Sequence, residues 1–170
     1  VAAALADLAA SFRGESWEHG ECFADVPFPV LAVVAMGGGD AVNVVPDRCV
    51  MICGLRCLPG QDPSTLIARI EAAIAGSTDL PWTLDRLRDN PAMLTATDAP
   101  LHSWLKAHLG QEADLGVSYG TDGGHLCGMD FDCVVWGPGD IGVAHKCDEF
   151  VPIAEIDAYC EALEAAIGAF

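Results

Sequence analysis

The sequence has few basic residues, and this shortage narrows the choice of partners. Its 170 residues include 8 Lys and Arg against 25 Asp and Glu, which gives a formal net charge of −17. Such a chain repels phosphate backbones and anionic lipid headgroups at ordinary salt concentrations. We therefore expect neither a nucleic acid nor a membrane among its partners.

Long apolar runs are also missing from the sequence. No segment approaches the roughly 20 apolar residues that a membrane-spanning helix needs. The opening VAAALADLAASF has neither the basic start nor the cleavage pattern of a signal peptide. The sequence thus predicts a soluble, cytoplasmic protein. Because Val1 already lies inside a helical pattern, we also expect the chain to be a fragment.

Sequence motifs for two common kinds of chemistry are absent. There is no GxSxG nucleophile elbow, and no GKS or GKT follows the glycine-rich loops. The eight cysteines are irregularly spaced, and a composition that is 52% hydrophobic supplies a core without disulfides. We expect reduced thiols and look to other side chains for function.

The first half of the chain has the pattern of a two-layer α+β unit. Hydrophobic periodicity, turn residues and helix caps define its elements. We predict a helix over 2–12, strands over 28–36 and 41–58 joined by a GGGD turn, a helix that starts at Asp62 and stops at Gly76, and a strand over 80–88. This order is the βαββαβ plan without its first strand.

The second half alternates between helices and strands. We predict a helix over 99–110, a strand over 114–120, a short helix from Thr121, a strand over 131–139 and a helix over 152–170. Such alternation is typical of a mostly parallel sheet, in which functional loops follow the carboxyl ends of the strands.

His145 is the most suggestive histidine, because it lies in the glycine-rich loop GPGDIGVAHKCDEF that follows an apolar run. The residues alone leave three interpretations open: a metal ligand, a proton shuttle, or an ordinary loop histidine. The carboxylates of Asp148 and Glu149 could orient the ring or could simply be solvated.

Three further residues are candidates for binding a ligand. The Arg56 guanidinium could hold a carboxylate with a two-point fork and the Asn43 amide could add a hydrogen bond, but a surface arginine and a turn asparagine are the commoner explanation. Thr121 could cap a helix whose N–H groups meet an anion. We interpret His19, His102 and His108 as exposed loop or helix positions.

Taken together, the motifs resemble a family of zinc-dependent amidohydrolases and peptidases that includes acetylornithine deacetylase, succinyl-diaminopimelate desuccinylase, aminoacylase and glutamate carboxypeptidase. The segment GGGDAVNVVPDRCVMICGLRCLPG resembles the signature of that family's inserted dimerisation domain. YGTDGG resembles its Gly-Thr-Glu/Asp segment, and GPGDIGVAHKCDEF resembles its closing motif. The resemblance covers essentially the whole chain and is strongest to acetylornithine deacetylase.

The resemblance implies an α/β protein with two parts. Residues 1–88 would form a ferredoxin-like lid, or dimerisation, domain that lacks its first strand. Residues 89–170 would form the C-terminal part of the α/β zinc-peptidase catalytic domain. Members of the family form homodimers through the lid, and we expect the same here.

The resemblance also implies roles for particular residues. His145 would be a ligand in a site that holds two zinc ions, with cobalt as a possible substitute. Asn43 and Arg56 would hold the α-carboxylate of the substrate, in some members across the dimer, and Gly120 and Thr121 would line the pocket. The family's other ligands and its general base precede the part that this chain matches, so no catalytic base is assigned.

The implied reaction is hydrolysis of an N-acyl amino acid, with N-acetylornithine giving ornithine and acetate in arginine biosynthesis. The chain alone would be inactive. Cys147 stands where the family often has Pro, and Asp140 where acetylornithine deacetylases usually have Ser. Desuccinylase, aminoacylase and carboxypeptidase activities therefore remain open, as does a non-catalytic dimerisation or binding module.

Overall fold

The computed structural model describes residues 1–23, 25–129 and 131–170, which fall into two compact units. Unit 1 comprises Val1–Ala92 and Leu115–Gly124, and unit 2 comprises Met93–Asp114 and His125–Phe170. None of the described helices is long and apolar enough to cross a lipid bilayer.

Unit 1 is built on an antiparallel hairpin of β1 (Val30–Gly38) and β2 (Cys49–Arg56). Val30 pairs with Arg56 and Gly38 with Cys49, with one irregularity between Val33 and Ala35. The hairpin confirms the predicted strand pair. The predicted GGGD turn is wrong, because its first two glycines belong to β1 and the connection runs over residues 39–48.

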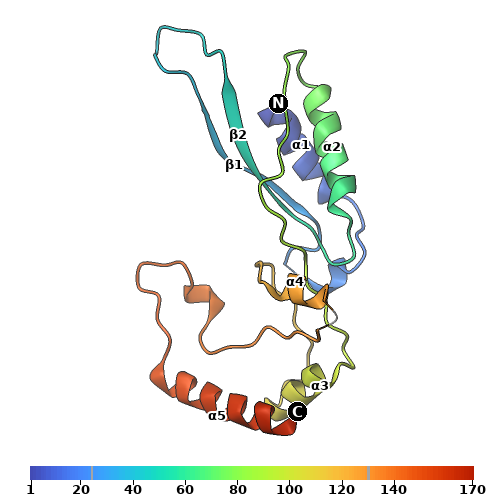
Figure 1. Ribbon diagram of the computed structural model, residues 1–170, viewed down its shortest axis with the longest axis vertical. Helices are drawn as coiled ribbons and strands as arrows, with labels where there is room; N and C mark the ends of the chain where they lie inside the picture. The colour runs from blue at the N-terminus through green and yellow to red at the C-terminus, as the bar shows by residue number, and fades with distance from the viewer. Residues whose placement is uncertain (24, 130) are drawn as a thin grey trace. The chain divides into compact units, whose positions relative to one another are not determined.

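Two helices lie side by side along the hairpin, as Figure 1 shows. They are α1 (Ala2–Phe12) and α2 (Pro63–Ala75), and a short 3₁₀ helix, η1 (Gly20–Cys22), lies between α1 and β1. The predicted helices are confirmed. The Asp62 side chain accepts a hydrogen bond from the Ser64 N–H at 2.9 Å, so the predicted N-cap is confirmed too.

The core of unit 1 lies between these two helices and the hairpin. Its buried members come from α1, β1 and α2: Leu5, Phe12, Leu31, Leu66 and Ile70. Their spacing on each helix is the apolar stripe from which the helices were predicted.

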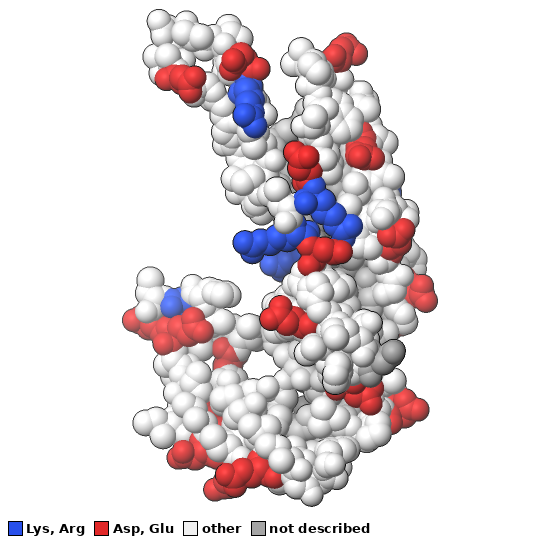
Figure 2. Space-filling view, in the orientation of Figure 1, with Lys and Arg blue, Asp and Glu red and all other residues white. Residues whose placement is uncertain are grey.

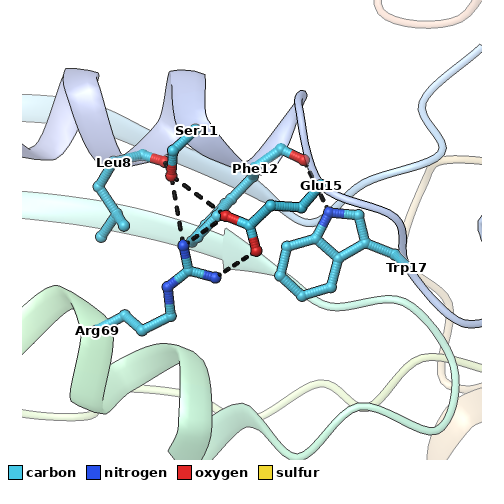
Figure 3. A network of polar contacts seen from close by, with 6 residues as sticks. All are labelled: Leu8, Ser11, Phe12, Glu15, Trp17 and Arg69. Atoms are coloured by element: carbon cyan, nitrogen blue, oxygen red, sulfur yellow. Dashed lines mark hydrogen bonds and ion pairs between the residues drawn. The ribbon is translucent and has the colours of Figure 1, made fainter.

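A polar network joins the end of α1 to α2 (Figure 3). The Arg69 guanidinium donates to both carboxylate oxygens of Glu15, at 2.8 and 2.6 Å. It also lies 4.7 Å from the centroid of the Phe12 ring, a cation–π distance. The Trp17 indole N–H donates to the Phe12 carbonyl at 2.7 Å, which secures the chain just after the helix.

Unit 2 contains the helices α3 (Pro100–His108) and α5 (Ile153–Ala169), which pack together, and a 3₁₀ turn, η2 (Ile141–Val143). Both α-helices were predicted. The short helix α4 (Gly123–Cys127), also predicted, spans the division between the units.

Three predicted strands are wrong. Residues 80–88, 114–120 and 131–139 are irregular, and within the described residues the sheet has two strands only. A strand needs a partner for its hydrogen-bond ladder, whereas an apolar pattern reports only the preferred burial of side chains. These segments pair with no other segment among the described residues, and some of their apolar side chains, such as Leu115 and Phe131, are 76% and 58% exposed.

The fold thus agrees with the predicted class in part. Helices and a small sheet are mixed, and the order helix, strand, strand, helix is present in unit 1. The last strand predicted for the lid is not formed, and neither is the parallel sheet predicted for residues 89–170 within the described part of that region.

Candidate functional site

Arg56 is the last residue of β2, and its side chain is exposed. Its Nη1 donates to the Ser118 carbonyl at 3.1 Å, and both residues belong to unit 1. A guanidinium carries five N–H donors, so this single bond leaves others for a ligand. Basic side chains are few on the face drawn in Figure 2, where acidic ones are scattered.

The segment that follows Ser118 carries two of the other predicted residues. A Cβ on Gly120 would lie 2.8 Å from the Asn90 side-chain nitrogen, so a larger residue would push that side chain away. The Thr121 hydroxyl accepts a hydrogen bond from the Gly123 N–H at 3.1 Å, just before α4 begins. The structure therefore brings Arg56 close to the segment that carries Gly120 and Thr121.

Asn43 lies elsewhere in unit 1. It is exposed within the 39–48 connection at the far end of the hairpin, and the whole of β2 separates it from Arg56. Seven residue steps of strand correspond to about 23 Å. Asn43 and Arg56 of one chain therefore cannot hold the same carboxylate, and the structure does not bring them together.

His145 lies in unit 2, in the loop that follows η2, and is exposed. Its φ of 62° is in the left-handed region, which histidine adopts more readily than most residues. Two carboxylates shape the loop: Asp140 accepts from the Gly142 N–H at 2.7 Å, and Glu149 from the His145 N–H at 2.9 Å. Orientation of the His145 ring was one of the predicted roles of Glu149. In the structure, the Glu149 carboxylate binds the His145 backbone N–H instead.

The fit of His145 to a zinc site can be judged from its surroundings. Its ring is exposed and makes no hydrogen bond within the described residues, so its nitrogens are accessible to an ion. Among the described residues, His145 belongs to no group of three or more side chains whose ligand atoms lie close together. His145 therefore fits as one ligand of such a site, and the described residues do not complete the site around it.

A cavity of about 300 Å³ in unit 2 involves none of the predicted residues. It is lined by Leu94, Thr95, Ala96, Cys127, Phe131, Asp132 and Cys133. Burial and the neighbouring Cys127 thiol raise the pKa of Cys133. A raised pKa keeps a thiol protonated and poorly nucleophilic, so Cys133 is not an activated nucleophile.

Sequence reasoning missed one cluster of polar side chains. His19, Glu21 and Cys22 place possible ligand atoms within 4.8 Å of one another, and His19 is half-buried where an exposed position was predicted. The sequence did contain a signal for this cluster, since three residues that can bind a metal lie within four positions.

Comparison with known proteins shows which family and which relatives the chain resembles. Residues 2–78 match the family described as the peptidase dimerisation domain. The chain is 30% identical over 143 residues to acetylornithine deacetylase of Myxococcus xanthus, a match that covers 82% of this chain and 37% of that protein.

Two other relatives extend the range of named activities. A putative [LysW]-lysine/[LysW]-ornithine hydrolase of Pyrobaculum aerophilum is 33% identical over 131 residues, which is 76% of this chain and 36% of that protein. N-acetyl-L-citrulline deacetylase of Xanthomonas campestris is 26% identical over 182 residues, which is 98% of this chain and 48% of that protein. The chain thus spans less than half the length of these relatives.

Unit 1 therefore contains a peptidase dimerisation domain. The chain belongs to the amidohydrolase family that includes acetylornithine deacetylase and succinyl-diaminopimelate desuccinylase.

Proposed function

We propose that the protein that carries this chain hydrolyses the amide bond of an N-acyl amino acid, with N-acetylornithine as the substrate and ornithine and acetate as products. The observation that carries the proposal is Arg56, an exposed guanidinium beside the segment with Gly120 and Thr121. The names of the acetylornithine deacetylases among the relatives support this choice of substrate. Residues 1–88 serve as the lid and residues 89–170 as part of the catalytic domain, in the cytoplasm.

In this proposal the α-carboxylate of the substrate binds the Arg56 guanidinium through charge-assisted hydrogen bonds. Gly120 and Thr121 line the pocket beside it, and the absence of a side chain on Gly120 lets the Asn90 side chain pack against this segment. Asn43, which lies too far from the Arg56 of its own chain, reaches the substrate of a second subunit.

His145 is the proposed zinc ligand, and the Glu149 carboxylate fixes the backbone that presents it. The chemistry that zinc supplies in such sites is activation of a bound water and polarisation of the amide carbonyl. The relatives include a putative succinyl-diaminopimelate desuccinylase, so a desuccinylase is the second candidate.

We further propose that the protein is a homodimer through the hairpin. Exposed apolar side chains lie on the face of the hairpin that is turned away from the core residue Leu31, namely Val34, Val50 and Ile52. Clusters of exposed apolar side chains commonly mark interfaces between proteins, and residues 2–78 match a dimerisation domain.

The carboxylate-binding role of Arg56 is tested by Arg56→Ala. We expect KM for N-acetylornithine to rise roughly 10- to 100-fold, because a charge-assisted hydrogen bond is lost, while KM for the analogue without the α-carboxylate hardly changes. Steady-state kinetics with both compounds measure the difference, and Arg48→Ala, another exposed arginine, is the control.

The analogue separates two effects of the substitution. Loss of the hydrogen bond to Ser118 would loosen the neighbouring segment and would weaken the binding of both compounds alike. Equal changes in KM for the two compounds would therefore refute the carboxylate-binding role.

A further inference from the structure

The 3₁₀ turn η1 gathers three side chains that can bind a metal ion. One ligand atom from each of His19, Glu21 and Cys22 lies within 4.8 Å of the other two. His19 is half-buried, and the other two are exposed, so an ion could reach the group from solvent. The cluster shares no residue with the proposed amidohydrolase site.

The local backbone explains why these side chains meet. The Cys22 N–H donates to the His19 carbonyl at 3.2 Å, which closes a tight turn. The first and fourth residues of such a turn have Cα atoms less than 7 Å apart. His19 adopts a φ of 59°, in the left-handed region, and this conformation starts the turn.

Close packing holds the turn in place. A Cβ on Gly20 would lie 2.6 Å from the Pro27 carbonyl oxygen, so the backbone there approaches as closely as glycine allows. A Cβ on Gly60 would lie 3.5 Å from the His19 ring, which places that ring against the segment after β2. The three possible ligands are therefore carried by a packed turn. Less conformational entropy is then lost when an ion binds.

The set of donors selects the kind of ion. An imidazole, a carboxylate and a thiol suit Zn²⁺ and similar transition metals, whereas Ca²⁺ and Mg²⁺ prefer oxygen ligands alone. Ligand atoms around a tetrahedral zinc lie roughly 3.3–3.8 Å apart, because the metal–ligand bonds are about 2.0–2.3 Å long. The three atoms lie within 4.8 Å of one another, so they would have to move closer by about 1 Å to reach that spacing. The Glu18 carboxylate, 3.7 Å from His19 Nε2, adds negative charge that favours a cation.

We propose that His19, Glu21 and Cys22 form a zinc site that braces unit 1. The fourth coordination position is left to water. The carbonyl of Cys22 packs so closely on Gly116 that any Cβ there would overlap it. A bound ion thus stiffens a turn that contacts both the segment after β2 and the 115–124 segment.

The test uses the chelator-treated 170-residue chain with its thiols reduced, titrated with Co²⁺ and then with Zn²⁺. We expect one equivalent of Co²⁺ to give a near-ultraviolet charge-transfer band from a thiolate ligand, Zn²⁺ to displace it, and Zn²⁺ to raise the melting temperature. Cys22→Ser should abolish the band, whereas Cys160→Ser, at another exposed cysteine, should keep it.

Two more variants test the other ligands without disturbing the turn. His19→Asn keeps a residue that tolerates the left-handed conformation, and Glu21→Gln changes an exposed side chain. Each should weaken Co²⁺ binding at least about tenfold, and circular dichroism of the metal-free variants should match that of the wild type.

Several results would overturn the site. One is a wild-type chain that gives no thiolate band and no shift in melting temperature. Another is a band that survives Cys22→Ser, which would mean adventitious binding at other cysteines. An unchanged affinity in both His19→Asn and Glu21→Gln would also refute it.

Discussion

At the scale of single residues, Arg69 makes several contacts of different kinds in unit 1. It pairs with both oxygens of Glu15, lies over the Phe12 ring and is 5.9 Å from the centroid of the Trp17 ring (Figure 3). The hydrogen bond from Arg69 lowers the pKa of Glu15, and desolvation opposes this effect only in part.

This lowered pKa predicts a pH dependence of stability. A carboxylate whose pKa is lower in the folded state stabilises the fold above its unfolded pKa, about 4.3 for Glu, and loses that contribution as the pH falls through the folded value. Glu15→Gln should therefore lower the urea midpoint at pH 7 and flatten its fall below about pH 4.3.

Urea titrations between pH 2.5 and 7 provide the measurement. Glu71→Gln, at an exposed position on α2, is the control and should keep the wild-type slope. A Glu15→Gln chain with the wild-type pH profile would show that the ion pair contributes nothing.

The sequence pointed to some candidate residues and not to others. His145 and Arg56 were predicted from motifs, since each lies in a distinctive local pattern. Arg69 and Glu15 were not, because 54 positions separate them and only packing brings them together. His19, Glu21 and Cys22 are adjacent in sequence, but their meeting depends on a left-handed residue that no motif specifies.

At the scale of elements, helices were predictable because their signals are local. The helix α2 begins at Pro63 behind the Asp62 cap and ends before Gly76, as its sequence indicates. Strands 80–88, 114–120 and 131–139 were predicted from local patterns of apolar and polar residues. Their pairing depends on distant partners, and the structure forms no ladder there among the described residues.

The Asp62 cap gives a prediction for α2. Asp62→Ala should lower the free energy of unfolding by about 1 kcal/mol, because the Ser64 N–H loses its acceptor. Asp62→Asn should retain most of this stability, since an asparagine oxygen caps equally well. Urea unfolding of the three chains makes the comparison, and equal midpoints for Asp62→Ala and wild type would contradict it.

At the scale of the whole molecule, the candidate residues are divided between the two units. Arg56, Gly120 and Thr121 belong to unit 1 and His145 to unit 2. Asn43 is separated from Arg56 by the length of β2, so the proposed site needs two subunits. Dimerisation is therefore part of the functional proposal.

The proposed dimer predicts the effect of a charge on the hairpin. Ile52→Glu should convert the dimer to monomer, because a carboxylate would be buried in an apolar interface. Light scattering after size-exclusion chromatography measures the mass. Leu109→Glu, at an apolar side chain of similar exposure in unit 2, should remain dimeric. Equal masses for both variants would argue against the hairpin interface.

The most direct test of the proposed function is His145→Ala in the protein that carries these residues. Zinc content and ornithine release from N-acetylornithine are measured together, with His108→Ala, another exposed histidine, as control. We predict that His145→Ala loses bound zinc and that its turnover falls at least about 100-fold, because outer-shell losses alone cost 10- to 100-fold. Wild-type zinc content and turnover in that variant would contradict the account.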